Sequence, residues 1–264
     1  MPRIAVGIEY DGSGFAGWQT QQAVRTVQQI LEGALGAVAA QPVSLVAAGR
    51  TDAGVHARAQ VAHFDTDAER SSRGWLLGAN TELPADVSIS WVQPVPGHFH
   101  ARYCAEERIY RYLILNRTAR SALHAARATW VTRALDAAAM AAAAALLIGE
   151  HDFSAFRSAE CQARSPVRRL RTLTVARRGD WVVIEAAANA FLHHMVRNIA
   201  GLLIAVGKGD EPPGRARTVL EGRDRTRAPA TAPAAGLYLW EIRYPAAFAI
   251  PTPAGEEGGS ADQL

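Results

Sequence analysis

The order of its periodic segments constrains the fold of this chain more than any other sequence feature. Between residues 4 and 91, alternating apolar segments and segments of helical periodicity follow one another as β-α-β-β-α-β. Between residues 109 and 244 the same order recurs, with an extra short helix near 213–221. The two stretches share no evident sequence similarity, so the repeat is one of architecture. The pattern predicts an α+β fold of two ferredoxin-like, or RRM-like, halves forming an antiparallel sheet with helices on one side.

The same pattern suggests how the chain is divided into domains. We expect an N-terminal lobe over residues 1–105 and a C-terminal lobe over 106–245. Residues 246–264 are assigned to a disordered tail, because the stretch 250–264 is rich in Pro, Gly and acidic residues. Hydrophobic residues make up 49% of the chain, enough for a sizeable core.

Several features point to a cytoplasmic protein without a membrane segment. No apolar run reaches the length of a bilayer span. The strand pattern begins immediately after the N-terminus, with no signal-peptide core. Cys104 and Cys161 lie in unrelated contexts and are expected to be buried thiols, as in a reducing compartment.

Charge is distributed unevenly along the chain. Residues 106–244 carry 21 Lys and Arg against 13 Asp and Glu, whereas residues 1–105 carry 7 against 9. A basic second half suggests a polyanionic partner such as a nucleic acid. All basic residues except Lys208 are arginine, a bias that codon usage in a GC-rich genome explains equally well.

Local signals set the expected element boundaries. Thr26 and Gln29 have the spacing of a capping box at the start of a helix that Pro42 ends. A strand is expected over 43–48 and another over 60–65. In the second half, a hairpin turns around residues 178–180. A helix over 192–206 is expected to present Met195, Ile199, Leu202 and Val206 on one face.

The loop between the strands 43–48 and 60–65 is the strongest candidate site. It contains Arg50 and Asp52, two residues apart and flanked by small residues. In an extended backbone such residues point the same way, so a guanidinium would lie beside a carboxylate and keep it ionised. An ionised aspartate suits a nucleophile or a base. The alternative is a polar turn with a weak surface ion pair.

Two other motifs are weighed and set aside. Residues 12–17 match G-x-G-x-x-G after a strand, but the next helix is capped only at Thr26, so a dinucleotide site is not expected. His193 and His194 are expected to lie on a helix and to diverge by about 100°, which argues against a shared metal ion. No metal site is predicted.

Two further positions admit both a structural and a functional interpretation. Tyr110 and Tyr112 share one face of a strand, where they can pack in the core or stack on RNA bases. Arg197 lies close to the two histidines, and on helical geometry alone it is expected to be a surface residue.

Taken together, these segments resemble the tRNA pseudouridine synthase A family. The resemblance runs in family order from about residue 4 to 244, and its matching stretches are 10–13 with 17–19, 49–56, 99–102, 108–112, 191–198 and 236–239. It implies two ferredoxin-like lobes with a central active-site cleft. It also implies a homodimer without cofactors that isomerises uridines at positions 38, 39 and 40 in the anticodon stem-loop of tRNA.

The resemblance also implies roles for five residues. Asp52 would be the catalytic aspartate, with Arg50 paired to it and a candidate to help displace the target base. Tyr110 would contact the flipped uracil and is a candidate for proton removal from its C5. Arg197 and Leu237 would line the same pocket, with Arg197 orienting the Asp52 carboxylate.

The sequence leaves two questions open. Asp52 could attack C1′ of the ribose, attack C6 of the base, or take a proton to assist glycal formation. The alternative function is a non-catalytic RNA-binding protein of paired RRM-like halves, which the doubled element order and the basic second half also suit.

Overall fold

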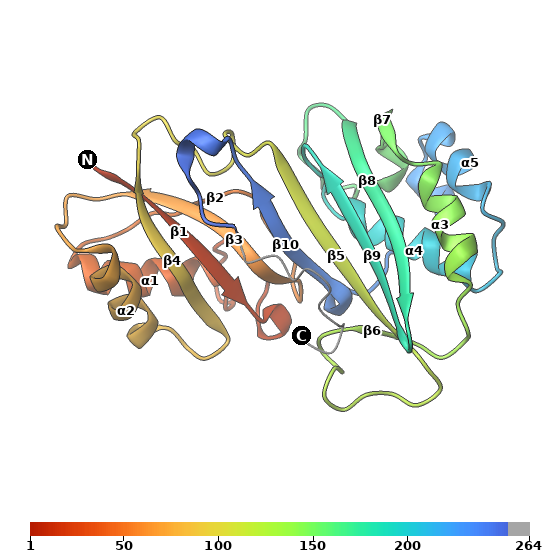
Figure 1. Ribbon diagram of the computed structural model, residues 1–264, viewed down its shortest axis with the longest axis horizontal. Coiled ribbons are helices and arrows are strands. Elements are labelled where there is room, and N and C mark those ends of the chain that lie inside the picture. Colours follow the sequence, from red (N-terminus) through yellow and green to blue (C-terminus); the bar gives the residue numbers. More distant parts are fainter. Residues whose placement is uncertain (253–264) are drawn as a thin grey trace. The chain divides into compact units, whose positions relative to one another are not determined.

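The computed structural model describes residues 1–252 and divides them into two compact units (Figure 1). Of the described residues, the first unit comprises 1–106 and 238–252, and the second comprises Glu107–Leu237. The stretch 238–245, which the sequence pattern assigns to the second lobe, therefore belongs to the first unit. Within this stretch, Tyr238 and Leu239 pair in parallel with His56 and Ala57.

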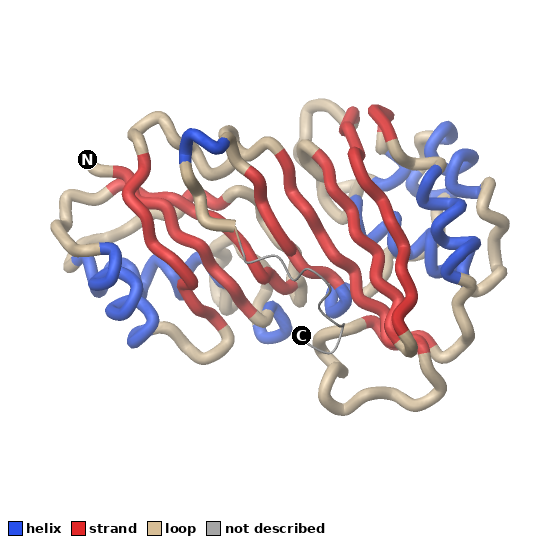
Figure 2. Tube along the Cα trace, in the orientation of Figure 1, coloured by secondary structure: helices blue, strands red, loops and turns tan. Residues whose placement is uncertain are grey.

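The first unit is built on antiparallel strands. Its elements are β1 Arg3–Tyr10, α1 Val27–Ala39, β2 Val46–Ala47, β3 His56–Asp65, α2 Ser72–Glu82, β4 Val87–Val95 and most of β10 Leu237–Arg243. The strand order is β4-β1-β3, and β2 and β10 both pair with β3. The two helices lie side by side (Figure 2), where Val38 of α1 packs over Gly78 of α2. The predicted order β-α-β-β-α-β is confirmed for this unit.

The start of α1 differs from the predicted capping box. Thr26 is the N-cap residue as expected, but its side chain makes no capping hydrogen bond and its hydroxyl is buried without a partner. The first free N–H groups are bonded instead by the preceding loop: Val27 N donates to Gly17 O at 3.2 Å and Gln28 N to Trp18 O at 3.0 Å. Backbone carbonyls thus satisfy the donors that a threonine side chain usually serves.

The strand expected over 43–48 is reduced to Val46–Ala47, whereas β3 begins four residues earlier than expected, at His56. Leu45 N donates to the carboxylate of Glu32 on α1 at 2.9 Å, so this backbone group pairs with a helix side chain and not with a neighbouring strand.

The second unit is also mainly antiparallel. Its elements are β5 Glu107–Asn116, β6 Thr129–Val131, α3 Ala137–Ala145, β7 Gly149–Asp152, β8 Val167–Arg178, β9 Trp181–Ala188, α4 Met195–Gly207 and α5 Arg215–Gly222. The strand order is β5-β9-β8-β7, with β6 parallel to β5. The predicted hairpin joins β8 to β9 and turns at Gly179, which has a φ of 57°. The three helices form one group beside the sheet (Figure 2).

Helix α4 begins three residues later than predicted. His194 takes the left-handed conformation, with a φ of 63°, and acts as the N-cap residue. Both histidines therefore precede the helix, and their rings lie 4.1 Å apart. The expectation that helical geometry makes them diverge is wrong. The predicted apolar face of α4 is confirmed, since its four residues are buried.

Three smaller expectations have mixed outcomes. Cys104 and Cys161 form no disulfide, although only Cys161 is fully buried. In the predicted tail, Ala246–Phe248 forms a 3-10 turn whose Phe248 ring contacts Phe99, and residues 253–264 lie outside the described part. Within residues 1–252, the helices are too short or too polar to span a bilayer.

The buried end of β3 carries a histidine that makes stability depend on pH. His63 is almost fully buried, and its Nδ1 accepts a hydrogen bond from Ala101 N at 3.1 Å. Burial, with a further contribution from Arg3, lowers the pKa of His63 from 6.5 to about 4. The folded state therefore holds this imidazole neutral, whereas the unfolded chain protonates it below pH 6.5. The stabilisation is present above that pH and is lost as the pH falls towards 4.

We predict that lowering the pH from 7 to 5 reduces the free energy of unfolding by about 2 kcal/mol through His63. Urea unfolding followed by tryptophan fluorescence measures this change. The variant His63→Asn, whose amide oxygen can still accept from Ala101, should show a pH dependence smaller by that amount. The same pH dependence in both proteins would contradict the assignment.

Candidate active site

Asp52 lies on the loop that enters β3. The loop turns at Ala53 and Gly54, where Gly54 has a φ of 76°, and Val55 N donates to Asp52 O at 3.1 Å. This turn leaves the Asp52 side chain half-buried. The neighbouring Thr51 is buried, so the Asp52 carboxylate is attached to a fixed backbone and not to a free loop tip.

The glycine-rich segment 12–18 braces the Asp52 loop through backbone hydrogen bonds. Trp18 N donates to Thr51 O at 3.0 Å, and Gly54 N donates to Phe15 O at 3.3 Å. These two bonds join the segment to the loop on both sides of Asp52. Since Gly17 O and Trp18 O also receive the first N–H groups of α1, the helix, the segment and the loop form one connected unit.

Two glycines make this close approach possible. A Cβ on Gly12 would lie 1.9 Å from the Val55 carbonyl oxygen. A Cβ on Gly17, whose φ is 95°, would lie 2.7 Å from the Thr51 carbonyl oxygen. Side chains are excluded at both positions. The first and last glycines of the G-x-G-x-x-G motif thus serve contact with the Asp52 loop. Residues 12–14 form only a short 3-10 turn, and the next α-helix begins at Val27, outside the motif.

Side chains complete the support of the loop. The hydroxyls of Tyr10 and Thr51 are hydrogen-bonded at 2.8 Å, and both residues are buried. On the other side of Asp52, Nδ1 of His56 accepts a hydrogen bond from Gly12 N at 3.0 Å. The His56 ring stacks on Tyr238 with centroids 4.5 Å apart. The residues before and after Asp52 are therefore both fixed to the sheet.

Arg50 does not pair with Asp52 in this structure. Its side chain is exposed and forms no ion pair with any residue in the range 1–252. The expected pairing assumed the alternation of a strand, and residues 50–52 belong to no strand. Arg50 is thus left at the surface near the loop, where it can meet a ligand.

In the second unit, the two tyrosines of β5 separate into different environments. Tyr112 is fully buried, and its hydroxyl donates to Pro233 O at 2.8 Å and is hydrogen-bonded to Thr129. Burial raises the pKa of Tyr112 well above its usual value, so this phenol stays neutral. Tyr110 is 8% exposed, and its ring meets Phe191 edge to face at 5.1 Å. Tyr112 is a core residue, which leaves Tyr110 as the candidate for contact with a base.

Arg197 and Leu237 are joined through one segment of the same unit. Arg197 lies in the first turn of α4 and is half-buried, and its Nε donates to Ala232 O at 2.9 Å. Ala232 N in turn donates to Arg197 O at 3.1 Å. The segment then leads through Gly236 to the buried Leu237. Arg197 is therefore not the surface arginine that helical geometry alone predicts.

The structure thus divides the five predicted residues between the units. Arg50 and Asp52 belong to the first unit, and Tyr110, Arg197 and Leu237 belong to the second. Sequence reasoning missed Tyr10, Thr51 and His56 as supports of the loop, although all three lie in stretches that carry the family resemblance.

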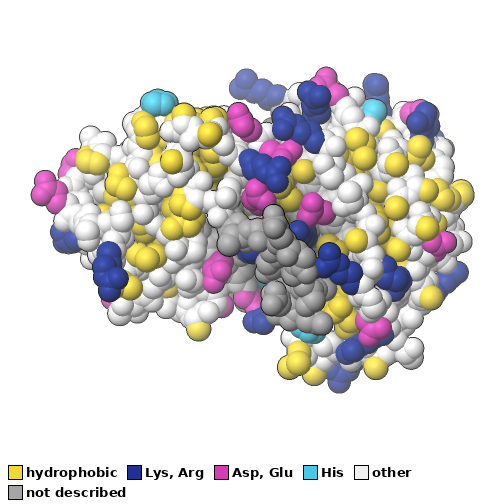
Figure 3. Space-filling view, in the orientation of Figure 1, with side chains coloured by type: hydrophobic (Ala, Val, Ile, Leu, Met, Phe, Trp, Pro, Cys, Tyr) yellow, Lys and Arg dark blue, Asp and Glu magenta, His cyan; other side chains and the backbone are white. Residues whose placement is uncertain are grey.

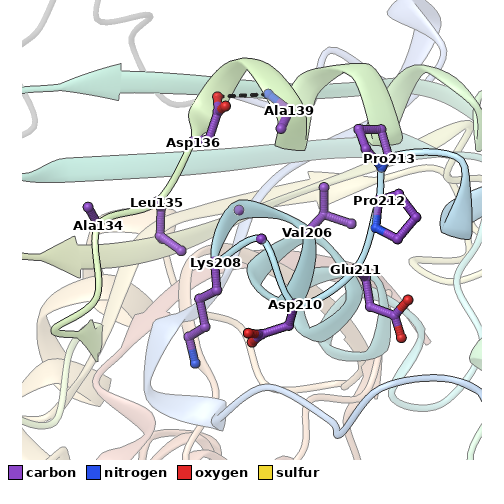
Figure 4. Close-up of a pocket in the computed structure, with 12 residues that line it drawn as sticks. Ala134, Leu135, Asp136, Ala139, Val206, Lys208, Asp210, Glu211, Pro212 and Pro213 are labelled. Atoms are coloured by element: carbon purple, nitrogen blue, oxygen red, sulfur yellow. Dashed lines mark hydrogen bonds between the residues drawn. The ribbon is translucent and has the colours of Figure 1, made fainter.

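A cavity of about 730 Å³ in the second unit does not coincide with these residues (Figure 4). It lies between the start of α3 and the end of α4. Its acidic groups are already engaged: Asp136 caps α3 through Ala139 N, Asp210 pairs with Arg133, and Glu211 pairs with Arg215. The cavity therefore offers no convergent set of reactive side chains.

The second unit does provide a basic surface. Figure 3 shows Lys and Arg side chains spread over its visible face. Five arginines lie on β8 alone, and those at 169, 171, 177 and 178 are exposed. Exposed guanidinium groups can bind phosphates in two-point contacts.

Comparisons with known proteins show the family to which the chain belongs. The profile of the tRNA pseudouridine synthase family matches residues 7–104 and 143–245. The chain belongs to the tRNA pseudouridine synthase family. A protein of Nitrosococcus oceani called tRNA pseudouridine synthase A is 56% identical over 249 residues, which cover 94% of this chain and 96% of that protein. Proteins of the same name from Methylococcus capsulatus and Coxiella burnetii are 57% and 54% identical, over 94% and 95% of this chain and 92% and 96% of their own.

Family membership decides between the two functions that the sequence leaves open. It favours an isomerase that converts uridine in tRNA to pseudouridine over a non-catalytic RNA-binding protein. The matched ranges include the Asp52 loop and the segment that braces it, as well as Arg197 and Leu237. Tyr110 lies between the two ranges.

We predict that Gly17→Ala lowers the rate of pseudouridine formation by about 100-fold, because the new Cβ must displace the Thr51 carbonyl and with it Asp52. The rate can be followed by tritium release from uridine labelled at C5. The control is Gly33→Ala in α1, where a Cβ meets no atom within 4 Å and the rate should be unchanged. Wild-type activity of Gly17→Ala would show that the brace does not position the carboxylate.

Proposed function

We propose that this protein isomerises uridines at positions 38, 39 and 40 in the anticodon stem-loop of tRNA, with Asp52 as the catalytic carboxylate. The observation that carries the proposal is the half-buried Asp52 on a loop fixed at both ends, in a chain of the tRNA pseudouridine synthase family. A fixed carboxylate suits a reaction in which geometry between base and ribose must be held during bond exchange.

The reaction needs few chemical groups. The N1–C1′ bond breaks and a C5–C1′ bond forms. The hydrogen on C5 leaves as a proton and N1 takes up a proton, so product and substrate have the same composition. No electron is gained or lost and no group passes to a second molecule, so the chemistry calls for no redox cofactor. An ionised Asp52 can act on C1′ or C6 as a nucleophile, or accept a proton as a base. All three routes keep Asp52 as the essential group.

The other predicted residues take supporting roles. We assign contact with the uracil, and a part in removing the C5 proton, to Tyr110, whose ring packs edge to face on Phe191. Arg197, fixed to Ala232, orients the carboxylate, and Leu237 packs on the base. The exposed Arg50 helps displace the target base from its stack. The target uridine must be flipped out, at a cost of about a few kcal/mol that is lowest in a loop.

The basic surface of the second unit is proposed to bind tRNA. Phosphate contacts from its exposed arginines offset the cost of base flipping and make affinity fall as salt concentration rises. The same contacts give no sequence information, so we assign the selection of positions 38–40 to the shape of the stem-loop.

Further features of the proposal concern fold, assembly and location. In the first unit, the pairings β4-β1-β3 and β2-β3 give the order 4-1-3-2, which supports a ferredoxin-like half. The proposal extends that description to the second unit. It also includes a homodimer, which the family resemblance supports. A location in the cytoplasm is supported by the two free thiols. A monomeric mass by sedimentation at working concentration would contradict the dimer.

We predict that Asp52→Asn abolishes tritium release from tRNA labelled at uridine C5, because the amide can act neither as nucleophile nor as base. Wild type and variant are compared in buffer without additions. The variant should fold normally and bind tRNA with wild-type affinity.

The matched control is Asp67→Asn, an acidic residue beyond β3 that takes no part in the proposed site. This control should release tritium at the wild-type rate. Tritium release by Asp52→Asn near the wild-type rate would show that Asp52 is not the essential catalytic carboxylate. Release by neither wild type nor control, with tRNA binding intact, would overturn the proposed reaction.

A further inference from the structure

A loop of the first unit presents an aromatic side chain to solvent at a place that the proposed reaction does not use. Residues 96–106 join β4 to the next strand, and the side chain of Tyr103 on this loop is 76% exposed. The neighbouring Arg102 is also exposed. A single exposed aromatic residue is common on protein surfaces, so a binding role has to be argued from the contacts around it.

The loop is rigid around Tyr103. Nδ1 of His100 accepts hydrogen bonds from both Arg102 N and Tyr103 N, each at 3.2 Å. Cys104 N donates to His100 O at 2.9 Å and closes the turn. Burial lowers the pKa of His100, which keeps the ring neutral and able to accept. The exposed tyrosine thus stands on an ordered turn.

The turn is also anchored to the sheet. Ala101 N donates to His63 on β3, and the Tyr244 hydroxyl donates to Ala101 O at 2.7 Å. Arg3 donates to Phe99 O at 2.7 Å. Three long-range bonds therefore fix a short loop whose only large exposed apolar group is Tyr103.

The rings of this turn form a platform. The His100 and Tyr103 centroids lie 4.3 Å apart, with 32° between the planes, so the histidine supports one side of the tyrosine ring. The guanidinium carbon of Arg102 lies over the Tyr103 ring, 5.7 Å from its centroid. An exposed aromatic ring with a mobile guanidinium next to it is a combination that binds single-stranded nucleotides, since the ring stacks on a base and the cation meets a phosphate.

We propose that Tyr103 stacks on an unpaired nucleotide of the bound tRNA, with Arg102 contacting the adjacent phosphate. This inference rests on the proposed function, because it names a second contact with the same substrate. The contact lies away from the reacting uridine. His56 and His63 are seven residues apart on β3, roughly 23 Å, and the Asp52 loop and the Tyr103 loop are attached near these opposite ends.

The stacking contact predicts a defined order among substitutions. Tyr103→Phe keeps the ring and should bind tRNA with wild-type affinity. Tyr103→Ala removes the ring and should raise the Kd for tRNA by roughly 5- to 150-fold. The control is Leu77→Ala, an exposed apolar residue on α2, which should leave the Kd unchanged. Filter binding at fixed salt gives the three values, and sedimentation gives the mass of each variant.

The binding and mass measurements distinguish stacking of Tyr103 on a nucleotide from a role in a protein interface. Equal Kd values for Tyr103→Ala and wild type would overturn the stacking contact. So would a weakened Tyr103→Ala whose mass shows a lost subunit, since Tyr103 would then belong to a protein interface. A loss of affinity as large in Tyr103→Phe as in Tyr103→Ala would exclude stacking as the cause. Tritium release by wild type, measured in parallel, tests the proposed function separately.

Discussion

The structure of the candidate site depends on the close backbone contact between the glycine-rich segment 12–18 and the Asp52 loop. Hydrogen bonds to Thr51 O and from Gly54 N hold the loop on both sides of the aspartate, and the absence of side chains at Gly12 and Gly17 permits them. The same segment supplies carbonyl groups to the first turn of α1. A carboxylate fixed in this way needs little reorganisation to reach its reactive geometry, which lowers the entropic part of the barrier to such a bond exchange.

The two units supply different chemistry. The first unit provides the carboxylate on a braced loop, whereas the second provides an aromatic ring at Tyr110, a bound guanidinium at Arg197 and a basic surface. In the proposed reaction, phosphate contacts of the second unit offset the free-energy cost of flipping out the uridine. The first unit supplies the carboxylate for the exchange of bonds. The platform at Tyr103 would add a base contact on the first unit, which otherwise carries few cations.

Local patterns predicted most of the fold, because strand alternation and helical periodicity report directly on burial. The expectations failed where tertiary contacts replaced local ones. Leu45 pairs with Glu32 and shortens β2, and loop carbonyls replace the Thr26 cap. His194 takes a left-handed conformation that no apolar pattern reveals. For the site, the sequence predicts the Asp52 loop but not the residues that support it, since Tyr10 and His56 contact the loop only in the folded chain. Arg50 and Asp52 do not pair, and the assumption that they share one face rested on a strand that these residues do not form.

The most direct test of the account is to locate pseudouridine in tRNA after incubation with the purified protein alone. Carbodiimide labelling followed by primer extension reads each uridine of the anticodon stem-loop separately. The account predicts new pseudouridine at positions 38, 39 or 40, wherever these are uridine, and at no other position. Unchanged uridine at all three positions, or pseudouridine confined to another arm of the tRNA, would contradict it.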